Sequence, residues 1–186
     1  ISACLVGSEM CIRDSAHTYS DNNEVFIITG DRDILQCINE NVEVWLTKKG
    51  FTIYNRYTLD RFKNEYGLEP KQLIDVKAFM GDTADGYPGV KGIGEKTAIK
   101  LIQNHHSVEN VIQNISTLIP AQQKKINDNM NNLQLSKSLA EIHTQVPLES
   151  EQLFNEMAYA HELNEILSIC NEHELYVSGK YLASNF

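Results

Sequence analysis

The sequence lacks the features of a membrane protein, a disulfide-stabilised protein or a zinc-binding protein. No apolar run approaches the ~18 residues that a helix needs to cross a bilayer. The four cysteines form no Cys-x-x-Cys pair and no His-rich spacing, which predicts reduced thiols in a cytoplasmic protein. No basic segment precedes the apolar patch within residues 1–12, so these residues do not resemble a signal peptide.

Basic residues are also scarce. The 186 residues include 16 Lys and Arg against 25 Asp and Glu, which gives a net charge of −9. This charge excludes a protein that coats nucleic acid without specificity, although it permits a local basic patch. One such patch lies in residues 89–100, GVKGIGEKTAIK, where Lys91, Lys96 and Lys100 stand against Glu95 alone. The hydrophobic fraction of 42% is sufficient for the core of one domain.

The order of the predicted elements indicates an α/β core followed by helices. The apolar run VFIIT at residues 25–29 predicts a buried parallel strand, and further strands are expected at 42–47 and 50–54. From residue 58 onward the apolar period becomes helical, which predicts helices near 59–66, 70–80, 95–103, 108–115, 121–142 and 161–175. Residues 1–15 fit neither period, and residues 16–24 are expected to form a polar connector.

The glycine-rich loop Gly92-Ile93-Gly94 does not match either of two common nucleotide-binding motifs. A P-loop requires Lys-Thr directly after its last glycine, but Glu95 intervenes at that point. A dinucleotide fingerprint requires a preceding strand, whereas a loop precedes these glycines. A tight hairpin between two helices remains, and the amides at the start of the second helix can bind a backbone phosphate without reading a base. Two alternatives stay open: a turn that only joins two helices, and a turn whose carbonyls hold a monovalent cation such as K⁺.

Two pairs of aspartates precede this loop. Asp31 and Asp33 follow the strand at 25–29 and would share one side of an extended segment. Asp82 and Asp85 are three positions apart in a turn or a helix start, so they too can share a side. Four carboxylates that converge without a basic partner need a cation to offset their repulsion, and oxygen ligands suit Mg²⁺ or Mn²⁺. Two such ions form the usual clamp for phosphodiester hydrolysis, whereas a solvated Asp-rich turn is the alternative interpretation of each pair.

Four segments together resemble one family: TGDRDILQ at 29–36, LTKKG at 46–50, YGLEPKQLIDVKAFMGDTADGYPGVKGIGEKTA at 66–98 and LAEIHTQVPL at 139–148. They resemble the 5′→3′ exonuclease domain of bacterial DNA polymerase I and, equally, the stand-alone flap endonucleases of bacteria and phages. The resemblance extends from about Glu24 to the C-terminus. It implies an α/β fold in which a partial parallel-sheet, PIN-like nuclease core carries a helical helix–three-turn–helix subdomain that binds DNA.

The resemblance also implies roles for individual residues. Two divalent ions, Mg²⁺ or Mn²⁺, are expected at Asp31, Asp33, Asp82 and Asp85. DNA contacts are expected from the hairpin and its surroundings, at Gly89, Lys91, Gly92, Ile93, Gly94, Glu95, Lys96, Thr97 and Lys100. The expected partner is a flapped, nicked or 5′-ended DNA duplex, which a monomer binds with little sequence preference. A polymerase domain fused to the same chain is a further expectation.

One half of the family pattern has no counterpart in this sequence. Family members carry an early Asp at the end of the first strand, another Asp later, a basic and aromatic helical arch, and a Glu-x-Asp-Asp cluster. Residues 1–15 lie where that cluster is expected, but Glu9 and Asp14 do not reproduce it. The stretch VGSEMCIRDS resembles translated sequencing-adapter sequence, which predicts a foreign N-terminus on a truncated reading frame.

These observations predict four divisions of the chain. They are a non-native leader at 1–15, the C-terminal part of the nuclease core at 16–80, the helix–three-turn–helix subdomain at 81–142, and a segment at 143–186 that packs back on the core. The expected function is a structure-selective 5′ nuclease, as in Okazaki-fragment or repair processing. The alternative is a non-catalytic DNA-binding fragment that lacks a complete metal site. An Asp-based phosphatase is disfavoured because no nucleophilic Asp-x-Asp motif precedes Asp31.

Overall fold

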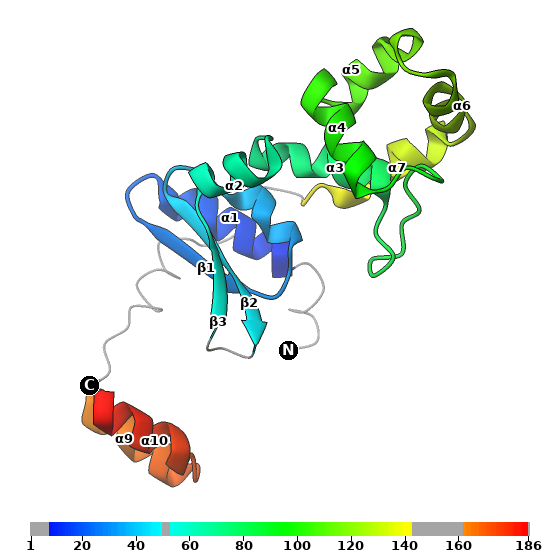
Figure 1. Ribbon diagram of the computed structural model, residues 1–186. Helices are drawn as coiled ribbons and strands as arrows, with labels where there is room; N and C mark the ends of the chain where they lie inside the picture. Colours follow the sequence, from blue (N-terminus) through cyan, green and yellow to red (C-terminus); the bar gives the residue numbers. More distant parts are fainter. Residues whose placement is uncertain (1–7, 50–52, 143–161, 186) are drawn as a thin grey trace. The chain divides into compact units, whose positions relative to one another are not determined.

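The computed structural model of the chain describes residues 8–49, 53–142 and 162–185 (Figure 1). Contacts within the chain divide it into two compact units, Ile1–Pro147 and Leu148–Phe186, and each is described here by itself. Among the described residues, every helix is too short or too polar to cross a membrane.

The first unit contains a three-stranded sheet in the order β1-β2-β3. Strand β1 (Val25–Thr29) pairs in parallel with β2 (Val42–Lys49), and β2 pairs antiparallel with β3 (Ile53–Tyr57). The apolar alternation of β2 buries Val42 and Val44 completely on one face. The predicted strands at 25–29 and 42–47 are confirmed, and the fold is of the predicted α/β class. The expectation that the first of these strands is buried is wrong, because Ile27 is buried whereas Phe26 and Ile28 are exposed.

The third predicted strand, at 50–54, is confirmed at residues 53 and 54 and extends further than predicted, to Tyr57. Residues 50–52 lie outside the described part of the chain, and β3 continues through Asn55 and Arg56 to Tyr57. Pairing with β2 holds these polar residues in the strand, with Trp45 opposite Arg56 and Val44 opposite Tyr57. The apolar pattern therefore did not predict the C-terminal end of this strand, because cross-strand partners rather than apolar content keep residues 55–57 extended.

Residues 8–20 form a helix, α1 (Ser8–Ser20), so the prediction of no regular structure before residue 15 is wrong from Ser8 onward. The predicted polar connector at 16–24 is correspondingly reduced to residues 21–24. Ala16 of α1 is buried, and Met10 and Ile12 pack partly against the core. Figure 1 shows α1 beside the sheet. The apolar positions of α1 are too sparse to give a sustained helical period, and contact with the sheet stabilises it instead. That residues 1–15 are foreign to the protein stays a prediction.

Helices α2 (Leu59–Tyr66) and α3 (Leu73–Met80) follow the sheet, with a short 3₁₀ turn, η3 (Pro70–Gln72), between them. Thr58 begins α2 by accepting a hydrogen bond from the Arg61 amide at 3.2 Å. Gly67, with φ of 63°, ends it as its position in the sequence predicts. Phe62 and Tyr66 stack at 4.7 Å between ring centroids and fix the buried face of α2.

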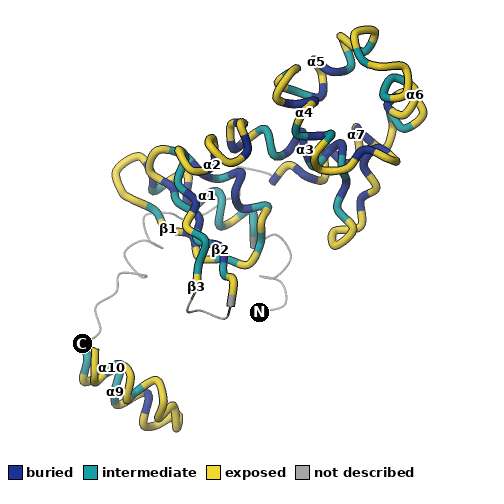
Figure 2. Tube along the Cα trace, in the orientation of Figure 1, coloured by how far each residue is buried: buried dark blue, intermediate teal, exposed yellow. Residues whose placement is uncertain are grey.

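Four further helices and one 3₁₀ turn complete the first unit. They are α4 (Glu95–His105), α5 (Val108–Gln113), η4 (Ile115–Thr117), α6 (Pro120–Asp128) and α7 (Met130–Ala140). Ser107 begins α5, as predicted, by accepting a hydrogen bond from the Asn110 amide. In Figure 2 the buried positions of α4, α5 and α7 alternate with exposed ones, as expected for helices with one face in a core.

The single helix predicted over 121–142 is in fact two helices that meet at Asn129. The Asn129 amide donates to Ile126 rather than one residue further back, and its side chain donates to the Lys125 carbonyl at 2.8 Å. Asparagine competes with the helix for backbone hydrogen bonds, which favours a break at this position. The break lets Ile126 and Leu133 both reach the core, where neither is exposed.

The second unit contains α9 (Leu163–Glu172) and α10 (Tyr176–Asn185). A reciprocal pair of side chain–backbone hydrogen bonds between Glu162 and Glu165 begins α9, and Cys170 is buried in this unit. The predicted helix at 161–175 corresponds to α9, whereas α10 was not predicted. Residues 143–161 lie outside the described part of the chain, so the expectation that 143–186 packs back on the core stays a prediction.

The loop between α3 and α4 packs closely against the end of α3, where Gly89 lies against Gly81. Gly89 has φ of 59°, and a Cβ there would lie 2.3 Å from the Gly81 amide nitrogen and 2.7 Å from the Phe79 carbonyl oxygen. Gly86 in the same loop has φ of 79°, but nothing lies within 4 Å of the position of its Cβ. Both glycines therefore carry the same backbone constraint, and only Gly89 carries a packing constraint.

We expect Gly89→Ala to lower the free energy of unfolding by about 2 kcal/mol more than Gly86→Ala, because only the former adds an overpacking cost to the strain of positive φ. Urea denaturation of the two variants measures the difference. Equal losses of stability in the two variants would contradict the close approach of the loop to α3.

Candidate metal centre and nucleic-acid interface

The first acidic pair lies where β1 ends. The Asp31 amide donates to the Thr29 hydroxyl at 3.0 Å, and the Asp33 amide donates to Asp31 Oδ1 at 2.8 Å. Arg32 between them is in the right-handed helical region, and Asp33 begins the 3₁₀ turn η2 (Asp33–Cys37). The extended arrangement expected for this pair is therefore wrong, because the Asp31 side chain folds back to form a turn with its own backbone.

The second acidic pair lies in the loop that follows α3. Asp82 pairs with Tyr87 through two backbone hydrogen bonds of 2.9 and 3.0 Å, which close a tight loop. Asp82 Oδ1 accepts the amides of Ala84 at 2.8 Å and Asp85 at 3.4 Å. The Asp82 carboxylate thus organises this loop and brings Asp85 to the same side.

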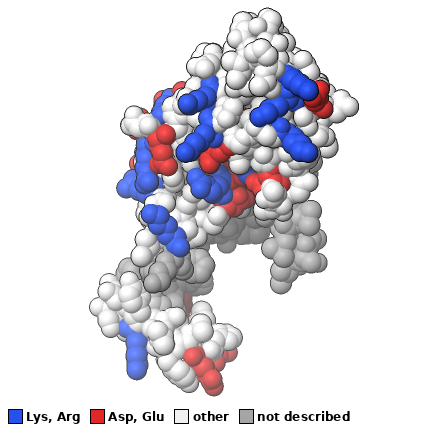
Figure 3. All heavy atoms as spheres, turned by 45° about the vertical axis from the view of Figure 1, so that its right-hand side comes forward, with Lys and Arg blue, Asp and Glu red and all other residues white. Residues whose placement is uncertain are grey.

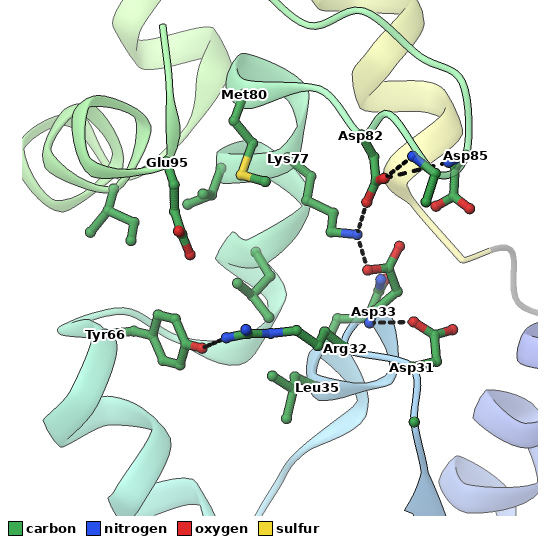
Figure 4. A pocket seen from close by; sticks show the side chains of 16 residues that line it. Asp31, Arg32, Asp33, Leu35, Tyr66, Lys77, Met80, Asp82, Asp85 and Glu95 are labelled. Carbon is green, nitrogen blue, oxygen red and sulfur yellow. Dashed lines mark hydrogen bonds and ion pairs between the residues drawn. The ribbon is translucent and has the colours of Figure 1, made fainter. Parts of the chain in front are cut away.

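Three of the four predicted metal ligands come together. One carboxylate oxygen each from Asp33, Asp82 and Asp85 lies within 4.8 Å of the others, a spacing that one metal ion could bridge (Figure 4). Asp31 is not part of this group of three. It lines the same cavity, and its side chain is committed to the turn with Asp33. Asp31 therefore lies beside the three clustered carboxylates, and its role as a metal ligand stays a prediction.

A lysine that the sequence analysis did not identify lies inside this acidic cluster. Lys77 Nζ forms ion pairs with Asp33 Oδ1 and with Asp82 Oδ2, the latter at 2.8 Å (Figure 4). The expectation of carboxylates without a basic partner is therefore wrong. Lys77 lies in the last turn of α3, five residues before Asp82. A lysine within one helical turn of an Asp-rich loop is the signal that could have identified it.

The charges of the cluster affect its two ends differently. The hydrogen bond from Lys77 lowers the pKa of Asp82, and the Ala84 amide adds to this effect while burial opposes it. Burial raises the pKa of Asp31, and the negative charges of Glu9 and Asp82 act in the same direction against the opposing charge of Lys77. Lys77 therefore favours the ionised form of both carboxylates, through a hydrogen bond at Asp82 and through its charge alone at Asp31, where burial outweighs it.

A cavity of about 360 Å³ connects the acidic cluster to the start of α4. Its lining includes the carboxylates, Lys77 and Met80 on one side and Glu95 and Ile99 of α4 on the other. Arg32 extends into it and donates to the Tyr66 hydroxyl at 2.8 Å (Figure 4). This hydrogen bond is the main cause that raises the pKa of Arg32, so the guanidinium is a fixed positive charge beside the acids.

The glycine hairpin lies at the start of α4, as the sequence predicts. Val90 and Ile93 are buried, and the Ile93 amide donates to the Val90 carbonyl at 3.0 Å. Gly94 precedes α4, and its carbonyl accepts the amides of Thr97 and Ala98, both at 3.0 Å. The first amides of a helix have no partner within that helix, so those of Glu95 and Lys96 are available to an anion.

The residues predicted to contact DNA separate into two groups. Gly89 and Ile93 are buried, and the Gly89 amide donates to the Ser136 hydroxyl at 2.9 Å, so these two residues contact the core, and their contact with DNA stays a prediction. Both hold the loop against the core. Thr97 is half-buried, and the exposed members of the set are Lys91, Gly92, Gly94, Glu95, Lys96 and Lys100. Figure 3 shows one view in which Lys and Arg side chains gather over the surface, with acidic side chains between them.

The chain is similar to known proteins, both in sequence and in fold. Residues 68–162, just over half of the chain, match the family described as 5′-3′ exonuclease, C-terminal SAM fold. The chain is 46% identical over 138 residues to the 5′-3′ exonuclease of Bacillus subtilis (strain 168), which covers 74% of this chain and 47% of that protein. It is 42% identical over 132 residues to DNA polymerase I of Lactococcus lactis subsp. cremoris (strain MG1363), which covers 69% of this chain and 15% of that protein. The chain therefore spans about half the length, or less, of these relatives.

Two solved structures have a similar fold. One is the 5′-exonuclease of bacteriophage T5 with bound divalent metal ions (zinc), at a TM-score of 0.58 and 23% identity over 69% of this chain and 49% of that one. The other is a variant of the bacteriophage T5 flap endonuclease in a complex with DNA and metal ions, at a TM-score of 0.60 and 22% identity over 73% of this chain and 48% of that one. At these identities the likeness shows a shared fold.

We expect Lys77→Met to raise the pKa of Asp82, because the variant removes the hydrogen bond that chiefly lowers it. A lowered pKa in the folded state stabilises the protein above the ordinary carboxyl pKa, and this stabilisation is lost as the pH falls through the folded-state value. The variant should therefore lose less stability on acidification. Carbon NMR of the Asp82 carboxyl during a pH titration without divalent ions measures the shift.

Lys71→Met is the matched control, because Lys71 is an exposed lysine of the neighbouring turn η3. An unchanged Asp82 titration in the Lys77 variant would show that the ammonium does not contact the carboxylate in solution.

Proposed function

The chain belongs to the 5′-3′ exonuclease family, and from this premise we propose that it is part of a structure-selective 5′→3′ exonuclease or flap endonuclease that acts on DNA. The observation that supports this proposal most strongly is the cavity that joins a carboxylate cluster to the amide end of α4. A nuclease needs both parts: one that binds cations at the reacting phosphate and one that holds the rest of the strand.

The donor set fits a hard divalent cation. Asp33, Asp82 and Asp85 offer only oxygen ligands, which suit Mg²⁺ or Mn²⁺. We propose that these three residues hold one ion and that Asp31, which lines the same cavity, contributes to the second. Bound ions would supply an activated water and offset the charge on the leaving oxygen. The bacteriophage T5 5′-exonuclease, which shares the fold, has bound divalent metal ions, and this supports the assignment.

The remaining residues bind and orient the substrate. The amides at the start of α4 can hold one backbone phosphate, and Lys91, Lys96 and Lys100 add positive charge around it. Arg32 is fixed by Tyr66 between this helix and the carboxylates, so it can hold a phosphate on the path between them. None of these groups reads a base edge, which accounts for the expected lack of sequence preference and for a steep salt dependence.

The names of the same relatives support a proposal for the biological setting. We propose a cytoplasmic role in replication or repair, such as the processing of Okazaki fragments, by a protein that binds DNA as a monomer. The match to DNA polymerase I supports a polymerase domain in the same protein as one form of it.

The alternative function is DNA binding without catalysis. The observation that favours it is the position of Lys77, whose ammonium lies between Asp33 and Asp82 and supplies positive charge there. A labelled 5′-flap substrate distinguishes the two functions for this chain. Binding in the presence of Mg²⁺ with no cleavage supports the alternative, and cleavage excludes it.

In the full-length protein that carries these residues, we expect the double variant Asp82→Asn, Asp85→Asn to cleave a 5′ flap at least about 100-fold more slowly in Mg²⁺, because it removes two anionic ligands. Asparagine keeps an oxygen that can accept the loop amides, so the loop itself is retained. Product formation on a denaturing gel measures the rate. Asp60→Asn, at an exposed position of α2, is the control. A double variant as fast as this control would show that the metal assignment is wrong.

A further inference from the structure

A lysine from a distant helix lies on the glycine hairpin. Lys125 of α6 donates from Nζ to the Gly92 carbonyl at 2.8 Å, across 33 positions of sequence. A Cβ at Gly92 would lie 3.1 Å from this Nζ and 3.2 Å from the Lys125 Cε, so the lysine side chain covers the hairpin closely. Gly92 has φ of 82°, which itself favours glycine. The hairpin therefore presents its carbonyl to an ammonium group of the protein.

The packing of neighbouring residues brings the two groups together. Ile126, next to Lys125, is completely buried, and Ile93, next to Gly92, is 4% exposed. Both belong to the same core cluster, so α6 and the hairpin are anchored in one hydrophobic core. The Asn129 side chain also donates to the Lys125 carbonyl at the end of α6. The position of the ammonium is thus determined by the fold as well as by its own hydrogen bond.

No acid among the described residues offsets the charge of Lys125. Lys77 pairs with Asp33 and Asp82, and Lys137 pairs with Asp75 and Glu109. No carboxylate in the described part of the chain forms an ion pair with Lys125. An ammonium has three donors, and the Gly92 carbonyl uses one of them. Lys125 is also exposed, so a bound phosphate can reach the others.

We propose that Lys125 is a DNA-positioning residue that supplies the cation at the hairpin, in place of the monovalent ion expected there from the sequence. Its ammonium bridges the Gly92 carbonyl to a backbone phosphate, next to the phosphate that the α4 amides bind. This inference rests on the proposed DNA-binding function. It assigns a role to α6, from which no residue was predicted to contact DNA.

The inference predicts that DNA binding by the hairpin does not need K⁺. A protein ammonium that already occupies the carbonyl leaves no requirement for a small monovalent ion, whereas an open carbonyl turn would distinguish K⁺ from a cation too large to enter it. Removal of Lys125 should create that requirement, and it should also remove one charge contact with a phosphate.

Fluorescence anisotropy of the full 186-residue chain with a labelled DNA duplex tests this, in KCl and in choline chloride of equal ionic strength. The wild-type dissociation constant should be the same in both salts. Lys125→Met should bind about five- to tenfold more weakly in choline chloride, recover partly in KCl, and show a salt slope lower by about one. Lys124→Met, at the adjacent exposed position of α6, should behave as the wild type does. A merely structural role for Lys125 would not change the salt slope or create a K⁺ dependence.

Two results would overturn the inference: wild-type binding that weakens when choline replaces K⁺, or a Lys125→Met variant indistinguishable from Lys124→Met. A wild-type chain that binds no duplex would contradict the proposed function instead. In that case the amide chemical shifts of Gly92 and Ile93 during a KCl titration still test the role of Lys125. They should respond to K⁺ in Lys125→Met and not in the wild type, and a response in the wild type would refute the inference.

Discussion

The contact of Lys77 with Asp33 and Asp82 joins the two segments on which the candidate site depends. Asp33 follows the end of β1 and Asp82 follows the end of α3, so the lysine connects the sheet to the helical half of the first unit. Carboxylates brought this close would repel one another without a cation between them. The ammonium offsets that repulsion within the folded chain. A divalent ion at the same carboxylates must therefore displace Lys77 or share them with it.

Close packing of glycines then fixes the distance from this cluster to the hairpin. Gly89 lies directly against Gly81, and the Val90 amide donates to the Phe79 carbonyl at 2.8 Å, so the loop starts and ends beside α3. The Asp82–Tyr87 pairing closes the acidic part of this loop, and buried Ile93 closes the other part. A phosphate held at the start of α4 is thereby held in a constant relation to the carboxylates. A fixed distance between the bound phosphate and the carboxylates suits the structure-selective nuclease proposed above.

The sequence predicts the structural features that depend on local signals, and it does not predict the contacts between residues that are far apart in the chain. The strand at 25–29, the Asp-rich loop and the Gly67 and Ser107 signals lie within short stretches, and they were predicted correctly. Lys77 contacts Asp33 across 44 positions of sequence and Lys125 contacts Gly92 across 33, and no local pattern predicts either of these two contacts. Gly89 and Ile93 are among the residues expected to contact DNA because a motif identifies a loop without distinguishing its inner face from its outer face. The helix α1 was missed for the same reason as the lysines, since packing on the sheet stabilises it.

The most direct test of the account is anomalous X-ray scattering from crystals of this chain soaked in MnCl₂. The account predicts a manganese peak bounded by Asp33, Asp82 and Asp85, with the Lys77 ammonium moved away from at least one of the two carboxylates that it contacts without the ion. Crystals with no peak at these carboxylates, and with Lys77 still bridging Asp33 and Asp82 at saturating manganese, would contradict it.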